Sequence, residues 1–327
     1  MPDLGDRVKS TRIWCAWIWE NAVVPKLIPF AAITIASSTV LFAQASLQHQ
    51  IAAIAADAKG KVSVACSLPG SALNCDFNPY AHPPMQSVFK APLALAVLHL
   101  VEGGKFPLDA PVRFRASDRI PGAYSPLQDQ YPAGDVDVPL RQLLNLAVSL
   151  SDNVAADLLL RLIGGPAVVD RYIKDAGILG FHIEDDEASL HRDPKAQYRN
   201  WFEPAGAVQF LRRLNDHPPL TAEHAGLLLG WMRETSRGNH RISGRLPAGT
   251  IVMHKPGTSD TYNGLSPATN DIGLIALPDG RRLAIAIFVT DSTAGDAERD
   301  SVIARIAKAA YDAASASIKD NGNHVEN

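Results

Sequence analysis

The chain has 327 residues, of which 46% are hydrophobic, and a formal net charge of -3 at neutral pH. This length and apolar content suffice for one large domain or for two interleaved lobes around a buried core. Charged residues make up 20% of the chain and form no basic stripe and no long run of one sign. These features exclude nucleic-acid binding and argue against a disordered charged tail.

The first 45 residues predict a secretory signal peptide. Basic residues precede the apolar run LIPFAAITIASSTVLFA, which ends at the small-residue site Ala43–Ala45. The basic residues are Arg7, Lys9, Arg12 and Lys26. A membrane anchor is the alternative, since a run of about 17 apolar residues lies at the short end of what spans a bilayer. Cleavage predicts a periplasmic or secreted protein with no stable membrane partner.

Two cysteines remain beyond this leader, because Cys15 lies within it. Cys66 and Cys75 lie in KVSVACSLPGSALNCDF, where residues 68–71 have the composition of a hairpin turn between two apolar runs. An oxidising compartment permits a disulfide between them. Two half-buried thiols are the alternative, because the sequence does not fix the register of a hairpin.

Strand patterns occur at both ends of the remaining chain. Residues 60–78 predict two strands. Three more are predicted at residues 250–257, 270–278 and 281–290, the last two joined by an Asp-Gly turn. Helical patterns dominate the long segment between the two strand blocks, and residues 296–314 predict a closing amphipathic helix.

This order of elements predicts an α+β sandwich. A five-stranded antiparallel sheet is completed by both chain ends and flanked by helices, and an all-helical lobe is inserted between the strand blocks. The expected α/β lobe comprises residues 46–79 and 250–327, and the expected helical lobe comprises residues 80–249. The seam between two such lobes is a common place for a cleft.

A serine and a lysine open the most apolar of the predicted helices, in HPPMQSVFKAPLALAVLHL. Pro92 cannot lie deep in a helix, so the helix begins within about four residues before it, and Ser87 lies at its amino terminus. There the helix dipole favours negative charge on the hydroxyl oxygen. Lys90 lies on the same face, partly desolvated, and can accept a proton from Ser87. The alternative is an N-cap serine beside a lysine that reaches to solvent.

Two further polar motifs follow along the chain. Ser151, Asp152 and Asn153 lie in a break between two helices, where a simple N-cap is the alternative. Lys255 ends an apolar strand and is followed by Gly257 and two hydroxyl residues. A solvated lysine is the alternative there.

In the order S-x-x-K, S-D-N and K-x-G, these motifs resemble the signature of class A serine β-lactamases and penicillin-binding proteins. The resemblance covers about residues 60–315 and implies the fold of that superfamily. It implies a small-molecule β-lactam as substrate, no cofactor and no metal. The scattered histidines and the two remaining cysteines also lack metal-site spacing.

One segment favours a β-lactamase over a penicillin-binding protein. Class A enzymes activate water with a glutamate in an E-x-x-L-N segment of the omega loop. DDEASLHRD supplies Glu187, followed by Leu190 and by His191 in place of the asparagine. The spacing between Ser151 and Glu187 in the sequence matches that of the family. A surface acidic cluster is the alternative.

Three features resemble the PER-type extended-spectrum branch of class A: Gln86 before the nucleophile, His191, and QYRNW at residues 197–201. Most class A enzymes clamp the omega loop, here about residues 181–204, through an arginine two positions before the glutamate. Asp185 holds that position, so the usual clamp is absent and the loop is expected to fold as in the PER-type branch.

The resemblance implies catalytic roles for five residues. Ser87 is the nucleophile, and Ser151 passes a proton to the leaving lactam nitrogen. Either Lys90 or Glu187, acting through a water molecule, is the base of acylation. Glu187 then activates the deacylating water, and His191 is expected to affect how that water is positioned.

The resemblance also implies a set of substrate contacts. The backbone N–H groups of Ser87 and Thr258 form the oxyanion hole. The residues expected to bind or wall the substrate are Tyr124, Asn153, Arg241, Lys255, Gly257 and Thr258. Pro256 departs from the family's K-T-G motif, because it removes a hydroxyl and a backbone N–H. It is acceptable only where that N–H faces solvent or a sheet edge, and Thr258 and Arg241 are expected to compensate.

Two other functions stay open on the sequence alone. A DD-peptidase or an S-x-x-K esterase would keep Ser87 and Lys90 without needing Glu187. A non-catalytic cell-wall binding protein is supported only by Pro256. The extended-spectrum prediction rests on analogy with the PER-type branch. A monomer is the expected oligomeric state.

Overall fold

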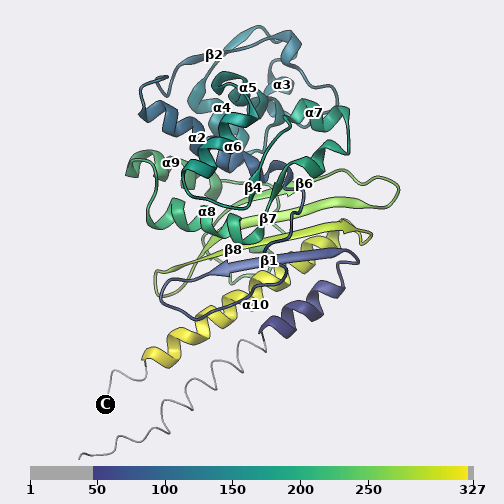
Figure 1. Cartoon of the computed structure of the whole chain (residues 1–327), viewed down its shortest axis with the longest axis vertical. Helices are drawn as coiled ribbons and strands as arrows, with labels where there is room; N and C mark the ends of the chain where they lie inside the picture. Colours follow the sequence, from purple (N-terminus) through teal and green to yellow (C-terminus); the bar gives the residue numbers. More distant parts are fainter. Residues whose placement is uncertain (1–46, 323–327) are drawn as a thin grey trace, which may run out of the picture. The chain divides into compact units, whose positions relative to one another are not determined.

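A four-stranded antiparallel sheet lies at the centre of the computed structural model, which describes residues 47–322 (Figure 1). Its strands follow the order β1-β8-β7-β6. They are β1 (Lys61–Ser67), β6 (Val252–Thr258), β7 (Ser266–Ala276) and β8 (Arg282–Ser292). The first strand comes from one end of the chain and the other three from the other end. The predicted α+β class with an antiparallel sheet completed from both ends is therefore confirmed.

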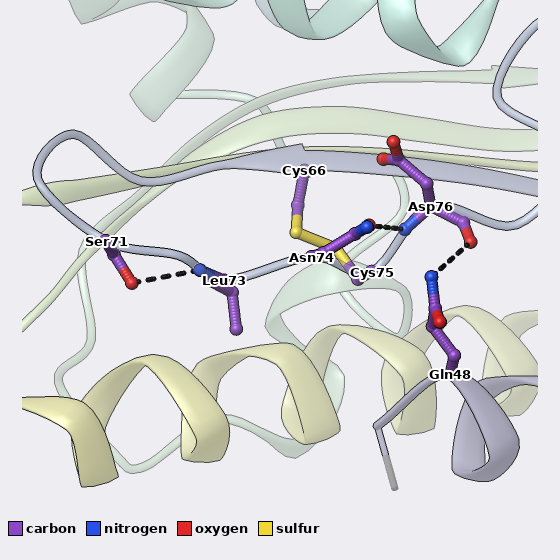
Figure 2. Close-up of a disulfide and its surroundings, with 7 residues drawn as sticks. All are labelled: Gln48, Cys66, Ser71, Leu73, Asn74, Cys75 and Asp76. Carbon is purple, nitrogen blue, oxygen red and sulfur yellow. Dashed lines mark hydrogen bonds between the residues drawn. A yellow bond between two sulfur atoms is a disulfide. The ribbon is translucent and has the colours of Figure 1, made fainter. Parts of the chain in front are cut away.

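The predicted fifth strand of this sheet is wrong. After β1 the chain forms only an isolated bridge between Val64 and Phe77. Side chains bond to the local backbone instead: Ser71 Oγ accepts from the Leu73 N–H at 3.1 Å, and Asn74 Oδ1 accepts from the N–H two residues on at 2.8 Å (Figure 2). Such local bonds compete with a strand ladder, so the segment runs as a loop.

A disulfide joins Cys66, next to the end of β1, to Cys75 in the following loop (Figure 2). The two Cα atoms lie 5.7 Å apart. Cys75 is fully buried, and the bridge closes a short loop over the sheet edge. Of the two alternatives left by the sequence, the structure therefore contains the disulfide.

Both faces of the sheet are buried, which explains the uninterrupted apolar run of β8 from Leu283 to Val289. Alternate residues of β8 enter two different cores. The first core holds Ala284, Ala286 and Phe288, and the second holds Leu283, Ile285, Ile287 and Val289. The helix at residues 47–56 and α10 (Asp296–Gly322) belong to the second core (Figure 1). The helical lobe and α8 (Pro204–Asp216) cover the other face.

The helical lobe is built around α2 (Lys90–Glu102), whose first nine residues are all buried. Around it lie α3 (Pro126–Gln130), α4 (Leu140–Ser149), α5 (Asn153–Ile163), α6 (Pro166–Asp175), α7 (Glu187–Arg192) and α9 (Ala222–Arg233). The predicted all-helical content needs a correction, because two small two-stranded sheets lie in this segment. They pair β2 (Pro111–Phe114) with β3 (Val136–Pro139), and β4 (Phe181–His182) with β5 (Trp201–Phe202).

The pairing of β4 with β5 closes the base of the predicted omega loop. Phe181 lies opposite Phe202, and the Glu203 N–H donates to Gly180 O at 2.7 Å. The loop therefore begins and ends at one point, and α7 and the short 3-10 helix η3 (Ala196–Arg199) fill it. This arrangement holds Glu187 over the helical lobe.

Some predictions are not tested by this fold. The predicted signal peptide lies outside the described residues, and the predicted lobe boundaries stay predictions. Across residues 47–322 the structure contains no helix that is both long and apolar enough to cross a membrane.

Candidate active site

Ser87 lies in a short 3-10 helix, η1 (Gln86–Phe89), which leads directly into α2. Pro92 is the third residue of α2, as the sequence predicted. Gln86 has a φ of 49°, a left-handed conformation that is rare for residues other than glycine. Strained backbone of this kind is tolerated where the surrounding structure fixes it, and here it sets the direction in which the Ser87 side chain leaves the helix.

Lys90 connects four oxygen atoms in the buried centre of the site. Its Nζ lies 2.9 Å from Ser87 Oγ, 2.8 Å from Ser151 O and 2.6 Å from Asn153 Oδ1. These three contacts match the three protons of an ammonium group. Glu187 Oε1 lies 2.9 Å from the same nitrogen as an ion pair. That oxygen is buried and has no hydrogen-bond partner among the described residues, so it can accept a further hydrogen.

The S-D-N motif fixes Ser151 between α4 and α5. Asp152 caps α5 by accepting from the Ala155 N–H at 2.9 Å, and it also accepts from Ser125 Oγ at 2.7 Å. Ser151 itself has a φ of 62°. The N-cap reading of the sequence is therefore correct for Asp152. It also leaves the Ser151 hydroxyl free to accept from Lys255 Nζ at 2.9 Å.

Lys255 is completely buried near the end of β6. Burial, together with the nearby charge of Lys90, holds its pKa well below the ordinary lysine value. Its Nζ also donates to Pro256 O at 3.1 Å. The alternative of a solvated lysine is therefore wrong, and the ammonium lies inside the site beside Ser151.

Pro256 lies on the outer side of an edge strand, which meets the condition set by the sequence. Backbone groups of Ile251 and Ser259, at the two ends of β6, both bond to β7 at 2.9 Å. Because direction alternates along an antiparallel strand, Pro256 and Thr258 direct their backbone nitrogens to the free edge. Pro256 thus removes no bond of the ladder, and the Thr258 N–H faces the side on which η1 lies.

Gly257 allows β6 to approach η1. A Cβ atom at this position would lie 2.5 Å from Met85 O and 3.1 Å from Gln86 Cβ. No real Cβ comes so close to backbone oxygen, so any side chain here would push the strand away from the serine. The glycine of the K-x-G motif is thereby explained by space.

Asp157 of α5 fixes the backbone of Glu187, a role that the sequence did not reveal. Its two carboxylate oxygens accept from the N–H groups of Glu187 at 2.8 Å and Ala188 at 2.9 Å. Asp186 caps the same helix by accepting from the Ser189 N–H. Burial and the charges of Glu187 and Asp186 raise the pKa of Asp157 to about 8, although the two N–H groups oppose this shift.

His191, the family departure from asparagine, bonds to the other side of the same residue. Its Nδ1 lies 3.0 Å from Glu187 O. The N–H, the carbonyl and the carboxylate of Glu187 are thus each bound by a different side chain: Asp157, His191 and Lys90. The acidic residue sits in a specific site, and the alternative of a surface acidic cluster is wrong for Glu187, which is 3% exposed.

A clamp with reversed charges replaces the missing arginine of the omega loop. Asp185 accepts two bonds of 2.7 Å from Arg199. Asn200 holds the same turn, since its Oδ1 accepts from the N–H groups of Glu184 and Asp185 at 2.8 and 3.0 Å. The usual arginine is absent, as predicted, and the ion pair of Asp185 with Arg199 joins two parts of the loop instead. Paired Asp and Arg fourteen residues apart were the available signal.

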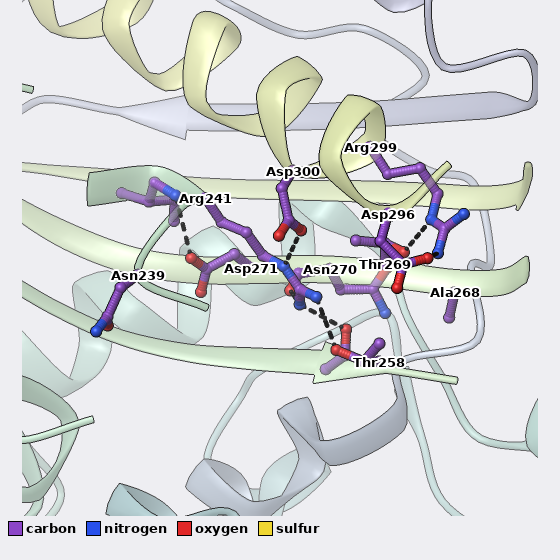
Figure 3. Close-up of polar contacts among 12 residues, drawn as sticks. Asn239, Arg241, Thr258, Ala268, Thr269, Asn270, Asp271, Asp296, Arg299 and Asp300 are labelled. Carbon is purple, nitrogen blue, oxygen red and sulfur yellow. Dashed lines mark hydrogen bonds and ion pairs between the residues drawn. The ribbon is translucent and has the colours of Figure 1, made fainter. Parts of the chain in front are cut away.

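Arg241 lies between Asp300 of α10 and the end of β6 (Figure 3). Its side chain donates to Asp300 at 2.7 Å, to Gly257 O at 3.0 Å and to Thr258 Oγ1 at 2.8 Å. A further N–H reaches Asn270 O. Arg241 is only 6% exposed. Four of its five N–H groups are bonded to protein acceptors, and among these the side chain of Thr258 lines the cleft.

These elements enclose one cleft of about 560 Å³. Its lining includes Ser87, Tyr124, Ser151, Asn153, Glu187, His191, Arg241 and Thr258. Lys90 and Lys255 lie buried beneath it. All the predicted site residues except the cysteines therefore gather in one place. Within residues 47–322 no cluster of three or more His, Cys, Asp or Glu side chains could hold a metal ion.

Residues 46–314 match the model of the beta-lactamase enzyme family. The chain therefore belongs to that family, and its relatives and structural neighbours make it a class A serine β-lactamase.

Named relatives agree with this assignment. The extended-spectrum beta-lactamase PER-1 of Pseudomonas aeruginosa is 41% identical over 265 residues, which cover 81% of this chain and 86% of that protein. Beta-lactamase VEB-1 of the same organism is 37% identical, over 72% of this chain and 78% of that protein. The solved structure of TLA-1 extended-spectrum β-lactamase superposes with a TM-score of 0.81 at 37% identity, covering 83% of this chain and 99% of that one.

Proposed function

We propose that this β-lactamase hydrolyses penicillins and cephalosporins through an acyl-enzyme on Ser87 and so confers antibiotic resistance. One observation carries the proposal: Lys90 Nζ lies 2.9 Å from Ser87 Oγ and 2.9 Å from Glu187 Oε1. A penicillin-binding protein needs only the first contact. The second places a carboxylate where it can serve the hydrolysis of the ester.

Acylation requires a base for Ser87 and an acid for the lactam nitrogen. As the Ser87 Oγ–carbon bond forms, the serine proton passes either to Glu187 through a water molecule or to Lys90, which acts as a neutral amine after giving one proton to the adjacent Glu187 carboxylate. The lactam C–N bond then breaks, and its nitrogen takes a proton from Ser151. Ser151 can be reprotonated through Lys255, whose lowered pKa makes an ammonium proton easier to release.

The charge that develops on the carbonyl oxygen needs fixed donors. The Ser87 N–H, at the start of the helix, and the Thr258 N–H, on the free edge of β6, are the proposed pair. Preorganised donors of this kind contribute several kcal/mol in related acyl-transfer reactions, typically about 3 kcal/mol each. Gly257 supports the proposal, because it keeps the strand close to η1.

Deacylation is assigned to Glu187. Its buried Oε1 has a free acceptor position, which suits a carboxylate that takes a proton from water as that water attacks the ester. His191 holds the Glu187 backbone and is proposed to set the place of the water. Asn153 and Tyr124 are proposed to contact the side chain and the ring system of the substrate.

The substrate range and the location are proposed from the relatives. PER-1 and TLA-1 are named extended-spectrum enzymes, and we extend that range to this chain. We also propose a periplasmic or secreted monomer, exported by residues 1–45. Size-exclusion chromatography with light scattering tests the monomer, and amino-terminal sequencing of the exported protein tests the leader.

The decisive experiment mixes the chain from Ser46 onward with a chromogenic cephalosporin while colour and intact mass are followed together. We expect fast colour with no lasting adduct, and neither colour nor adduct for Ser87→Ala. A persistent adduct without turnover would place the protein with the penicillin-binding class. Binding without any covalent adduct would support a non-catalytic function.

A further inference from the structure

Three of the four lysine and arginine side chains around the cleft are already matched by protein groups. Lys90 pairs with Glu187 at 2.9 Å, and Arg241 pairs with Asp300 at 2.7 Å. Lys255 is fully buried and donates to Ser151 and to a backbone carbonyl. A β-lactam brings a carboxylate into this cleft, and that anion needs a cation with free donors.

Arg237 is the remaining cation. It lines the cleft and is exposed. Its guanidinium carbon lies 4.4 Å from the centre of the Tyr124 ring. In the described part of the chain it has no carboxylate partner. Arg237 therefore carries a positive charge that no carboxylate of residues 47–322 neutralises.

The neighbours of Arg237 place it at the end of the cleft where β6 meets the S-D-N turn. The preceding residue, Ser236, donates its N–H to Ser149 O at 3.4 Å. On the other side, a Cβ at Gly238 would lie 2.9 Å from Pro256 Cβ, so this loop packs directly on the strand end. Arg237 thus leaves the backbone between Ser149 and Pro256 and reaches across to Tyr124.

We propose that Arg237 is the residue that binds the substrate carboxylate, and that Arg241 positions Thr258 from behind. The guanidinium contacts the Tyr124 ring at the lining of the cleft, and its planar fork suits two parallel bonds to a carboxylate. Arg241 cannot offer such a pair, because four of its five N–H groups are engaged. This inference rests on the proposed function, since it concerns the substrate of the same site.

A penicillin and its methyl ester test the proposal, because they differ only in the carboxylate charge. We expect Arg237→Gln to lower kcat/KM for the acid roughly five- to tenfold, mainly through KM, and to leave the ester within about twofold. Arg237→Lys keeps the charge but loses the planar fork and should lie between the two. Arg233→Gln removes an exposed charge of α9 outside the cleft and should leave kcat/KM unchanged for both the acid and the ester.

The salt dependence of the parent protein gives a second measurement that needs no variant to fold. Added salt should lower kcat/KM for the acid more than for the ester, and this difference should shrink in Arg237→Gln. Equal losses for acid and ester, or no loss for either, would overturn the role of Arg237. Failure of the proposed function is distinguishable, because the parent protein would then hydrolyse neither compound.

Discussion

The two walls of the cleft handle charge in opposite ways. On the helical wall, Lys90 and Glu187 are buried and ion-paired, and the three N–H groups of the Lys90 ammonium all have acceptors. On the strand wall, β6 ends at an open edge, and one arginine above it stays unpaired. With the roles proposed above, proton transfer is assigned to the buried network of the helical wall, and binding of the substrate carboxylate is assigned to Arg237 at the strand wall.

Removing the Glu187 carboxylate from the helical wall should have the largest effect. Glu187→Ala is expected to leave acylation measurable and to slow deacylation about 10³-fold, within the range of a general base. A stable acyl adduct should then appear in the intact mass. Glu184→Ala removes an exposed carboxylate of the same loop and should accumulate no adduct. Parental turnover by Glu187→Ala would remove this residue from the mechanism.

A side chain added at Gly257, on the strand wall, should have the second-largest effect. Gly257→Ala would place Cβ 2.5 Å from Met85 O, so the strand must move away from Ser87. A misplacement of about 1 Å can lower a rate about 10²-fold. We expect a loss of this order in acylation, measured as adduct formation. Gly226→Ala of α9 meets no atom within 4 Å and is the matched control, with unchanged activity and equal or higher stability. Normal acylation by Gly257→Ala would show that the close approach is dispensable.

A smaller effect is expected from changing Asp157, which holds the backbone of Glu187 on the helical wall. An amide can accept on only one side, so Asp157→Asn keeps one backbone bond and opposes the other with a donor. Loss of one buried bond should slow deacylation about tenfold, with little change in acylation. Asp186→Asn makes the same substitution at the N-cap of α7, the helix whose first N–H groups Asp157 binds, but keeps an equally good cap and should behave as the parent. Equal slowing of both steps would argue against a specific positioning role.

The raised pKa of Asp157 adds a dependence of stability on pH. Its carboxyl titrates at about 8 in the folded protein and near 3.8 in a free side chain. Between these values the folded state binds more protons, so this group lowers the unfolding free energy as pH rises toward 8. Denaturant unfolding at about pH 5 and about pH 9 should show a larger loss for the parent than for Asp157→Asn. Equal losses would contradict the shift.

The smallest effect is expected at Pro256. Its nitrogen faces the free edge, so Pro256→Thr restores an N–H that the ladder does not use. We expect kcat/KM to change no more than about twofold, the usual range for substitutions away from special contacts. Steady-state kinetics with the chromogenic cephalosporin measures this. A gain of tenfold or more would show that the proline weakens the site.

The motifs were predictable because short-range chemistry fixes them. Pro92 placed the start of α2, which placed Ser87 and Lys90 on one face, and the strand pattern around Lys255 placed it at a strand end. The antiparallel sheet completed by both chain ends followed from the order of the strand blocks. The fifth strand failed because Ser71 and Asn74 bond to their own loop, which no hydrophobic pattern reveals.

The residues that support the motifs were not predictable. In the sequence, Asp157 is an ordinary polar residue of an amphipathic helix. Its role depends on its contacts with the start of α7, which lies 30 positions further along the chain. Arg199 and Asp185 meet only because β4 and β5 close the omega loop. Arg241 was predicted to contact substrate, but its bonds to Asp300 and to the Gly257 carbonyl could not be predicted. Contacts of this kind depend on how distant segments meet, which local patterns do not encode.

The pairing of β1 with β8 constrains when this protein can fold. Lys61 bonds to Asp291, 230 positions away, so the central sheet has no complete core until nearly the whole chain is available. Sheets joined over such distances close slowly. A chain emerging from the ribosome therefore stays open until its last strands arrive. For a protein exported as proposed above, late closure leaves the polypeptide unfolded while translocation begins.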